Sequence, residues 1–210
     1  MGKMNIQDNF RKQSESSAKL KAVLKNARIG IAGLGGLGSH VGEMLIRSGS
    51  GRLTTADFDR VDSSNLARQC YRLSDIGKLK TDAIAEIASN ISPSCRIDKH
   101  TVRLSSENAC EVFRGCDIVC ECLDKAESKQ ELIETLLKAG RFIVVAGSGA
   151  AGLGRSNEIK TTKISERLYI AGDMKSSVEE LGSLWAPRVT IAAAHQANCV
   201  LELLEEKLCK

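Results

Sequence analysis

Two patterns of apolar and polar positions alternate along most of this chain. Short, mostly apolar runs are separated by longer segments in which apolar residues recur every three or four positions. The first pattern is typical of buried strands and the second of amphipathic helices. The expected strands are 28–33, 52–58, 95–102, 116–123 and 141–147. Their alternation with helices predicts a parallel sheet that is covered on both faces.

The periodic segments between these runs predict the helices. In residues 37–48, for example, Leu37, Val41, Met44 and Leu45 fall on one helical face. The expected helices before residue 147 are 15–26, 37–48, 75–91, 105–114 and 126–139.

The pattern changes after the fifth strand. A glycine-rich loop is followed by two alternating stretches at 158–164 and 167–172, which predict a short antiparallel hairpin. Residues 173–186 are expected to form a loop. Pro187 is expected to open a final helix that runs to about residue 208, because proline is tolerated in the first helical turn.

Together these elements predict an α/β fold. The expected sheet is Rossmann-like, doubly wound and mostly parallel, with short antiparallel strands near its C-terminal end. The 210 residues are enough for one well-buried domain and short for two. We therefore expect a single domain over residues 1–210, with an N-terminal helix at about 15–26 and an irregular crossover at about 147–186.

The hexapeptide GLGGLG lies between the first strand and the helix that follows it. It has the form GxGxxG, the glycine signature of a dinucleotide-binding turn. Gly33 would permit the tight turn, Gly35 or Gly36 would let the backbone approach phosphate, and Gly38 would allow close helix packing. The helix N-terminus adds free N–H groups and a positive dipole. The sequence therefore predicts a nucleotide site at this turn.

An acidic residue suited to a ribose ends the second expected strand. Asp57 follows the turn at about the 20-residue spacing of ribose-binding carboxylates. Asp59 points to the same side if the strand continues, and a loop cap is its alternative role. Because NAD and ATP both contain a ribose, these two residues leave the nucleotide open.

The next segment separates the two nucleotides. Arg68, Lys78 and Lys80 follow the acidic strand end, and Asn65 and Gln69 add groups that can orient phosphate. A dehydrogenase needs none of these cations, whereas a triphosphate with a departing pyrophosphate needs them to stabilise developing charge. The segment therefore favours ATP, with ordinary solvated charge as the alternative for Arg68 and Lys80.

Asp124 ends the buried strand at 116–123. Ligands of open α/β sheets bind at the carboxyl ends of strands, so a carboxylate here suits a Mg²⁺ ion beside phosphates. The alternative role is the N-cap of the helix at 126–139, and the two roles are compatible.

Composition excludes several other classes. The net charge of +4 is too small and too scattered to indicate nucleic-acid binding. No apolar stretch approaches the roughly 20 residues that span a bilayer, and no signal-peptide pattern opens the sequence, so we expect a cytoplasmic protein. The eight cysteines form no CxxC pair, so no zinc site is expected. We expect the cysteines to be reduced thiols in the core.

With these motifs in view, the chain resembles the ThiF/MoeB family of adenylyltransferases, relatives of the ubiquitin-activating enzymes. The resemblance covers about residues 15–205 and rests on the GxGGxG turn, DFD, SNLxRQ and GxxK. Two later segments are similar to the short branch of ThiF, the adenylyltransferase of the ThiS sulfur carrier of thiamine synthesis. They read VVAGSGAAGLGRSNEIKT and APRVTIAAAHQANCVLELL.

The resemblance implies a reaction. The C-terminal glycine carboxylate of a small ubiquitin-like carrier would attack the α-phosphate of Mg-ATP, forming an acyl-adenylate and releasing pyrophosphate. By motif, Gly36 would meet the phosphates and Asp57 the ribose, while Asn65, Arg68 and Lys80 would hold the triphosphate.

The same resemblance completes the expected site. Asp124 would bind Mg²⁺ and face the reacting carboxylate, and the protein would be a homodimer. The expected catalytic residues are Arg68, Lys80 and Asp124, with Asp124 as the metal ligand. The expected nucleotide-binding residues are Gly33, Gly35, Gly36, Gly38, Asp57, Asp59, Asn65, Arg68, Gln69 and Lys80.

Three departures from the family pattern matter. Longer relatives hold zinc on two CxxC pairs that this chain lacks. No cysteine lies between Cys122 and Cys199, where some relatives link covalently to the carrier. Lys125 stands where many relatives have Asn, and Arg11 is the one candidate for an arginine that relatives take from a partner subunit.

Other functions remain open from the sequence. The same chemistry would serve a molybdopterin-type carrier or the dehydration of a tRNA threonylcarbamoyl group. An NAD-dependent oxidoreductase and a non-catalytic partner subunit are the alternatives from other classes. The cationic segment argues against the first, and the combination of Arg68, Lys80 and Asp124 argues against the second.

Overall fold

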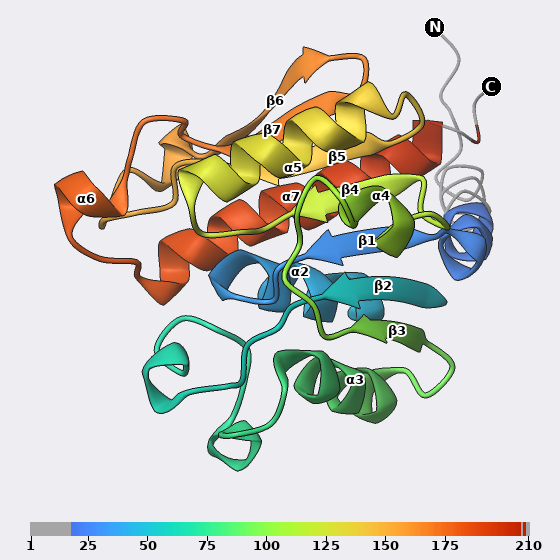
Figure 1. Ribbon diagram of the computed structural model, residues 1–210, viewed down its shortest axis with the longest axis horizontal. Coiled ribbons are helices and arrows are strands. Elements are labelled where there is room, and N and C mark those ends of the chain that lie inside the picture. The colour runs from blue at the N-terminus through green and yellow to red at the C-terminus, as the bar shows by residue number, and fades with distance from the viewer. Residues whose placement is uncertain (1–17, 207, 209–210) are drawn as a thin grey trace, which may run out of the picture.

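The computed structural model describes residues 18–206 and 208. Within these residues, seven strands form one sheet in the order β3-β2-β1-β4-β5-β7-β6 (Figure 1). Neighbouring strands pair in parallel, except that β6 and β7 are antiparallel. The strands are β1 (Ile29–Ala32), β2 (Arg52–Ala56), β3 (Arg96–His100), β4 (Ile118–Glu121), β5 (Ile143–Gly147), β6 (Lys160–Ser165) and β7 (Leu168–Gly172).

Helices cover both faces of this sheet. Helices α2, α3 and α7 pack on one face and α4 and α5 on the other, each set with its own apolar core cluster. Val144 and Val145, neighbours in β5, point into opposite clusters, as in a strand buried on both sides. The predicted Rossmann-like, doubly wound fold is therefore confirmed. The helices are α2 (Gly36–Arg47), α3 (Lys80–Ile91), α4 (Ala109–Val112), α5 (Ala126–Lys138), α6 (Val178–Leu181) and α7 (Ala186–Glu206).

The terminal helices lie close to their predicted positions. Residues 18–26 are helical, and the first three residues of the predicted helix lie outside the described part of the chain. Helix α7 begins at Ala186, one residue before Pro187. At 21 residues it is long, yet neither it nor another helix in the described residues has the length and hydropathy to cross a membrane.

The predicted start of the helix at 75–91 is wrong. Helix α3 begins only at Lys80, after a short 3-10 turn at Leu73–Asp75. Gly77 between them has a φ of +84°, a left-handed conformation that a continuous helix does not allow. The later start matters for the site, because it places Lys80 in the first helical turn.

Two shorter predictions also need correction. The helix expected at 105–114 is reduced to one turn, α4. The loop expected at 173–186 contains α6, whose N-cap Ser177 accepts a hydrogen bond from the Glu180 N–H and whose end is marked by Gly182 at a φ of +72°. Capping of this kind supports a single turn that hydrophobic periodicity does not reveal.

A buried ion pair holds the crossover to the start of α7. The Arg188 guanidinium contacts the Asp173 carboxylate at 2.6 Å, and both side chains are 2% exposed. Arg188 also donates to the Gly154 carbonyl at 2.5 Å. Two separate parts of the crossover, at Gly154 and at Asp173, are thus fixed to one guanidinium, which has the forked geometry for several acceptors.

The glycine turn is packed against its own strand. Gly33 has a φ of +87°, so it takes the left-handed conformation in which other residues are strained. A Cβ on Gly38 would stand 1.9 Å from the Gly33 carbonyl oxygen, closer than any real contact. Helix α2 therefore starts this near to β1 because Gly38 has no side chain.

We expect Gly38→Ala to destabilise the fold by about 1–3 kcal/mol, because the added methyl group must displace backbone rather than a flexible side chain. Urea denaturation followed by circular dichroism measures the change. Gly115→Ala is the control, since its nearest contact would be the flexible Arg28 side chain at 3.6 Å. Equal stabilities for the two variants would contradict the close packing described for Gly38.

Candidate nucleotide-binding site

A cavity of about 470 Å³ opens at the carboxyl ends of β1, β2 and β4. The strand order reverses here. From β1 the chain first adds β2 and β3 on one side of the sheet, and then adds β4 and β5 on the other side. Ligands of open α/β sheets bind at such a switch point. The cavity is lined by ten residues of the predicted site: Gly33, Gly35, Gly36, Asp57, Asp59, Asn65, Arg68, Gln69, Lys80 and Asp124.

Side chains hold the glycine turn at the floor of this cavity. The Leu34 N–H donates to Asp57 Oδ2 at 2.6 Å, and the Leu34 carbonyl accepts from the Tyr71 hydroxyl at 2.9 Å. Helix α2 follows, and its N-cap Gly35 has no side chain with which to cap the first N–H groups. These groups can therefore bind an anion.

Asp57 links the turn to the end of β2. Its side chain is 8% exposed, and its second oxygen, Oδ1, accepts from the Asp59 N–H at 2.8 Å. Burial raises the pKa of this carboxyl group, while the hydrogen bond from Leu34 opposes that shift. Each carboxylate oxygen has a further lone pair, so both can still accept from a ribose hydroxyl.

The strand expected at 52–58 ends two residues early and does not continue to Asp59, so the condition under which Asp59 would point to the same side as Asp57 is not met. The strand ends at Ala56, since Asp57 bonds to the backbone two residues on and so turns the chain. The Asp59 carboxylate instead contacts the Lys80 ammonium at 2.8 Å, and the Lys80 N–H donates to the Asp59 carbonyl. Lys80, with a side chain 7% exposed, is thereby held at the cavity wall.

The segment between β2 and α3 carries three more lining residues. Asn65 Oδ1 accepts from the Asp62 N–H within a 3-10 turn, so the side-chain amide nitrogen is the Asn65 group that can donate to a ligand. Arg68 donates to the Ser64 carbonyl at 3.1 Å. The buried Oε1 of Gln69 has no hydrogen-bond partner among the described residues. A buried polar atom of this kind fits a site that receives a polar ligand.

Asp124 and Lys125 form the opposite wall, just after β4. Both are exposed and line the cavity. The N-cap of α5 is Lys125, so the alternative role of Asp124 as that N-cap is wrong. The Asp124 carboxylate therefore serves no helix end. The described residues contain no group of three His, Cys, Asp or Glu side chains that could bind a metal by themselves.

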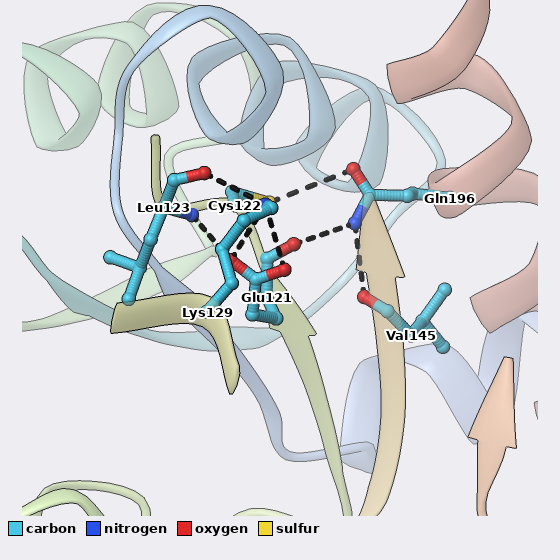
Figure 2. Close-up of polar contacts among 6 residues, drawn as sticks. All are labelled: Glu121, Cys122, Leu123, Lys129, Val145 and Gln196. Carbon is cyan, nitrogen blue, oxygen red and sulfur yellow. Dashed lines mark hydrogen bonds and ion pairs between the residues drawn. The ribbon is translucent and has the colours of Figure 1, made fainter. Parts of the chain in front are cut away.

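Cys122 also borders the cavity, but its thiol points to a buried amide. The Cys122 thiol donates to Gln196 Oε1 at 3.7 Å, and Gln196 Nε2 donates to the carbonyls of Glu121 and Val145 (Figure 2). Burial raises the pKa of the Cys122 thiol far above its ordinary value. Burial therefore disfavours the thiolate, which is the form of cysteine that acts as a nucleophile.

Sequence reasoning missed one end of the cavity. Val102, Arg103 and Leu104 line it together with Phe58, and the Arg103 guanidinium lies 4.0 Å from the centre of the Phe58 ring. Leu184, from the crossover, also reaches the cavity. The first three follow β3, so the rule that ligands meet the carboxyl ends of strands was a usable signal for them.

The fold and the cavity define an α/β protein with a glycine turn, a buried carboxylate and several cations around one switch point, the place where open α/β sheets bind their ligands. The ThiF family profile matches residues 9–209, so the chain belongs to the ThiF family. The resemblance to ThiF, MoeB and the ubiquitin-activating enzymes is confirmed.

Two curated relatives indicate what the family does. The chain is 38% identical over 133 residues to "Adenylyltransferase and sulfurtransferase UBA4" of Eremothecium gossypii, covering 63% of this chain and 30% of that protein. It is 35% identical over 149 residues to the tRNA threonylcarbamoyladenosine dehydratase of Haemophilus influenzae, covering 70% of this chain and 57% of that protein. The chain thus spans about a third to just over half of these relatives.

A solved structure shares the fold over nearly its whole length. The E. coli tRNA N6-threonylcarbamoyladenosine dehydratase in complex with ATP superimposes with a TM-score of 0.83, covering 98% of this chain and 99% of that one. The two sequences are 21% identical, so this likeness establishes the architecture. Arg11, the candidate for a partner arginine, lies outside the described residues.

We expect Asp57→Asn to destabilise the fold by about 1–3 kcal/mol, because an amide cannot accept from both the Leu34 and the Asp59 N–H groups. Urea denaturation at neutral pH measures the change. Asp62→Asn is the matched control: Asp62 is an exposed N-cap, where asparagine serves equally well. Equal effects of the two substitutions would argue against the bridging role of Asp57.

Proposed function

We propose that this protein uses ATP to adenylylate the C-terminal glycine carboxylate of a small ubiquitin-like sulfur-carrier protein, with release of pyrophosphate. One observation carries the proposal. A single cavity combines a helix N-terminus at Gly36 with Arg68 and Lys80 on one side and a carboxylate, Asp124, on the other. Relatives named as adenylyltransferases support the reaction class.

The proposed placement of ATP follows the charges. The first turn of α2 receives the phosphates, and Asp57 receives the ribose hydroxyls. Arg68 and Lys80 then stand beside the triphosphate, where they stabilise the negative charge that develops on the departing pyrophosphate. Lys80 keeps its contact with Asp59 while it does so, because an ammonium group has three hydrogens to donate.

The residues present fit a Mg²⁺ ion. Magnesium is commonly held by one or two carboxylates, with substrate phosphates and water as its other ligands. Asp124 offers one carboxylate at the cavity, and a hard oxygen donor is the type that Mg²⁺ prefers. When bound there, Mg²⁺ would neutralise part of the phosphate charge.

The proposed step needs little from the protein beyond positioning. An oxygen of the glycine carboxylate forms a bond to the α-phosphorus, and the bond from that phosphorus to the bridging oxygen breaks. Pyrophosphate leaves with the electron pair, and the carrier is left as an acyl-adenylate. A carboxylate is ionised at neutral pH, so no general base is required and catalysis rests on orientation and charge stabilisation.

A ThiS-like carrier for the thiazole of thiamine is the specific partner that we propose. The two later segments that resemble short ThiF proteins support it, and so does the sulfurtransferase activity named for the Eremothecium relative. Leu184 brings the crossover to the cavity edge, where an extended Gly-Gly tail would enter. We also propose that the protein forms a homodimer and lies in the cytoplasm. Sedimentation tests whether it is a homodimer.

A tRNA substrate is the second candidate. The 35% identity to a tRNA threonylcarbamoyladenosine dehydratase over 70% of this chain favours it. The two candidate functions differ in the substrate that the enzyme adenylylates. Incubation of the purified protein with ATP and either Gly-Gly-ending carriers or threonylcarbamoylated tRNA shows which substrate stimulates the release of pyrophosphate. A molybdopterin-type carrier belongs in the same panel.

We expect the wild-type protein to exchange labelled pyrophosphate into ATP when a Gly-Gly-ending carrier is present. Arg68→Ala and Asp124→Ala should each lower the exchange rate by about 10²–10³, the loss seen when one charge-stabilising group is removed. Arg114→Ala is the control, because that exposed guanidinium lies outside the cavity and pairs with Glu111. Exchange without any stimulation by carriers would refute the carrier proposal.

Magnesium dependence is a separate expectation. Chelation of divalent cations should abolish exchange, and added Mg²⁺ should restore it. Asp124→Asn should raise the half-saturating Mg²⁺ concentration by at least about tenfold, the loss that even an outer-shell residue of a metal site causes. Asp82→Asn, at an exposed carboxylate paired with Lys99, should leave it unchanged. An unchanged value in Asp124→Asn would remove Asp124 as the metal ligand.

A further inference from the structure

An ion pair between Glu121 and Lys129 lies next to the segment that carries Asp124, and neither of its residues lines the cavity. Glu121 is the last residue of β4 and is 0% exposed, and the Lys129 ammonium of α5 contacts its carboxylate oxygens at 3.0 and 2.9 Å. The Lys129 side chain is 20% exposed. Neither residue lines the cavity, so neither is in a position to touch a nucleotide.

Both partners bind the backbone of the residue before Asp124. Figure 2 shows the arrangement: Glu121 Oε1 accepts from the Leu123 N–H at 2.7 Å, and Lys129 Nζ donates to the Leu123 carbonyl at 2.8 Å. The two polar groups of one peptide residue are therefore held by the two members of one ion pair. Rotation of the chain at Leu123 would break both contacts at once.

The end of β4 is itself held in place. Gln196 of α7 is fully buried and donates to the Glu121 carbonyl at 3.0 Å and to the Val145 carbonyl at 2.9 Å (Figure 2). Strands β4 and β5 and helix α7 thus meet at one side-chain amide. The ion pair holds the next two residues in the same way, up to Leu123, which itself lines the cavity beside Asp124.

Stability alone does not explain the ion pair. Removing two charges from water is costly, and apolar residues of similar volume often replace a buried ion pair without loss of stability. The geometry points to another role: we propose that Glu121 and Lys129 are positioning residues that fix the backbone next to Asp124, so that its carboxylate is placed where it would hold Mg²⁺ beside the phosphates. This inference rests on the function proposed above.

The test variant removes the Glu121–Lys129 ion pair and keeps side chains of similar size at both positions. In the double variant Glu121→Gln/Lys129→Met, the Gln carbonyl can still accept from Leu123 N–H, but nothing donates to the Leu123 carbonyl. No unpaired charge is left buried, so the variant should fold. Lys138→Met is the matched control on the same helix, because its ion pair with Glu134 is exposed and lies outside the cavity.

The readout is nucleotide binding without any carrier. Calorimetric titration of ATP at several Mg²⁺ concentrations gives the half-saturating Mg²⁺ concentration for each protein. We expect it to rise about 10–100-fold in the double variant, the range found for residues that orient metal ligands, while ATP binding without Mg²⁺ stays unchanged. The control variant should match the wild type in both.

Distinct outcomes overturn the two proposals. A half-saturating Mg²⁺ concentration within about threefold of wild type in a folded double variant would overturn the positioning role. If the double variant does not fold, Lys129→Met alone is judged by the same criterion, because it also leaves the Leu123 carbonyl without its donor. A wild type that binds Mg-ATP normally but shows no exchange with any carrier would overturn the proposed function, while the binding comparison still decides the role of the ion pair.

Discussion

The hydrogen bond from the Leu34 N–H to the Asp57 carboxylate joins the glycine turn to the second strand, and the rest of the site is arranged around it. The other oxygen of Asp57 turns the chain at Asp59, and Asp59 in turn holds the Lys80 ammonium. The Asp57 carboxylate therefore sets the positions of the glycine turn and of the loop at Asp59. Through Asp59 it also sets the position of the Lys80 ammonium in the cavity wall.

The two central strands of the site end in the same way. At β1, the N–H and carbonyl of Leu34 are bound by the side chains of Asp57 and Tyr71. At β4, the N–H and carbonyl of Leu123 are bound by Glu121 and Lys129. A backbone that leaves a sheet loses its ladder partners, and buried side chains replace them here. The cavity is consequently bordered on both sides by backbone, at Leu34 and at Leu123, that side chains hold in place.

Much of this arrangement follows from local sequence, and the rest depends on distant partners. Apolar runs and the GxGxxG turn predict the sheet and the switch point, because burial on both faces leaves a continuous apolar pattern. The start of α3 and the turn at Asp57 were missed, since each depends on one residue's conformation or hydrogen bonds. Glu121 in the apolar run gave no signal of its partner Lys129, because their contact exists only once α5 packs beside β4.

The thiols near the cavity limit what this chain can do with sulfur. Cys122 borders the cavity, but its thiol contacts Gln196, and burial raises the pKa of that thiol. Cys70, beside the lining residue Gln69, donates to the Ser39 carbonyl, and burial raises its pKa to about 12. Because a thiolate is the form that attacks an acyl-adenylate, neither group is prepared to capture an activated carrier. Under the proposed function, activation and sulfur transfer are therefore separate events, and the sulfur nucleophile reaches the adenylate from outside these two positions.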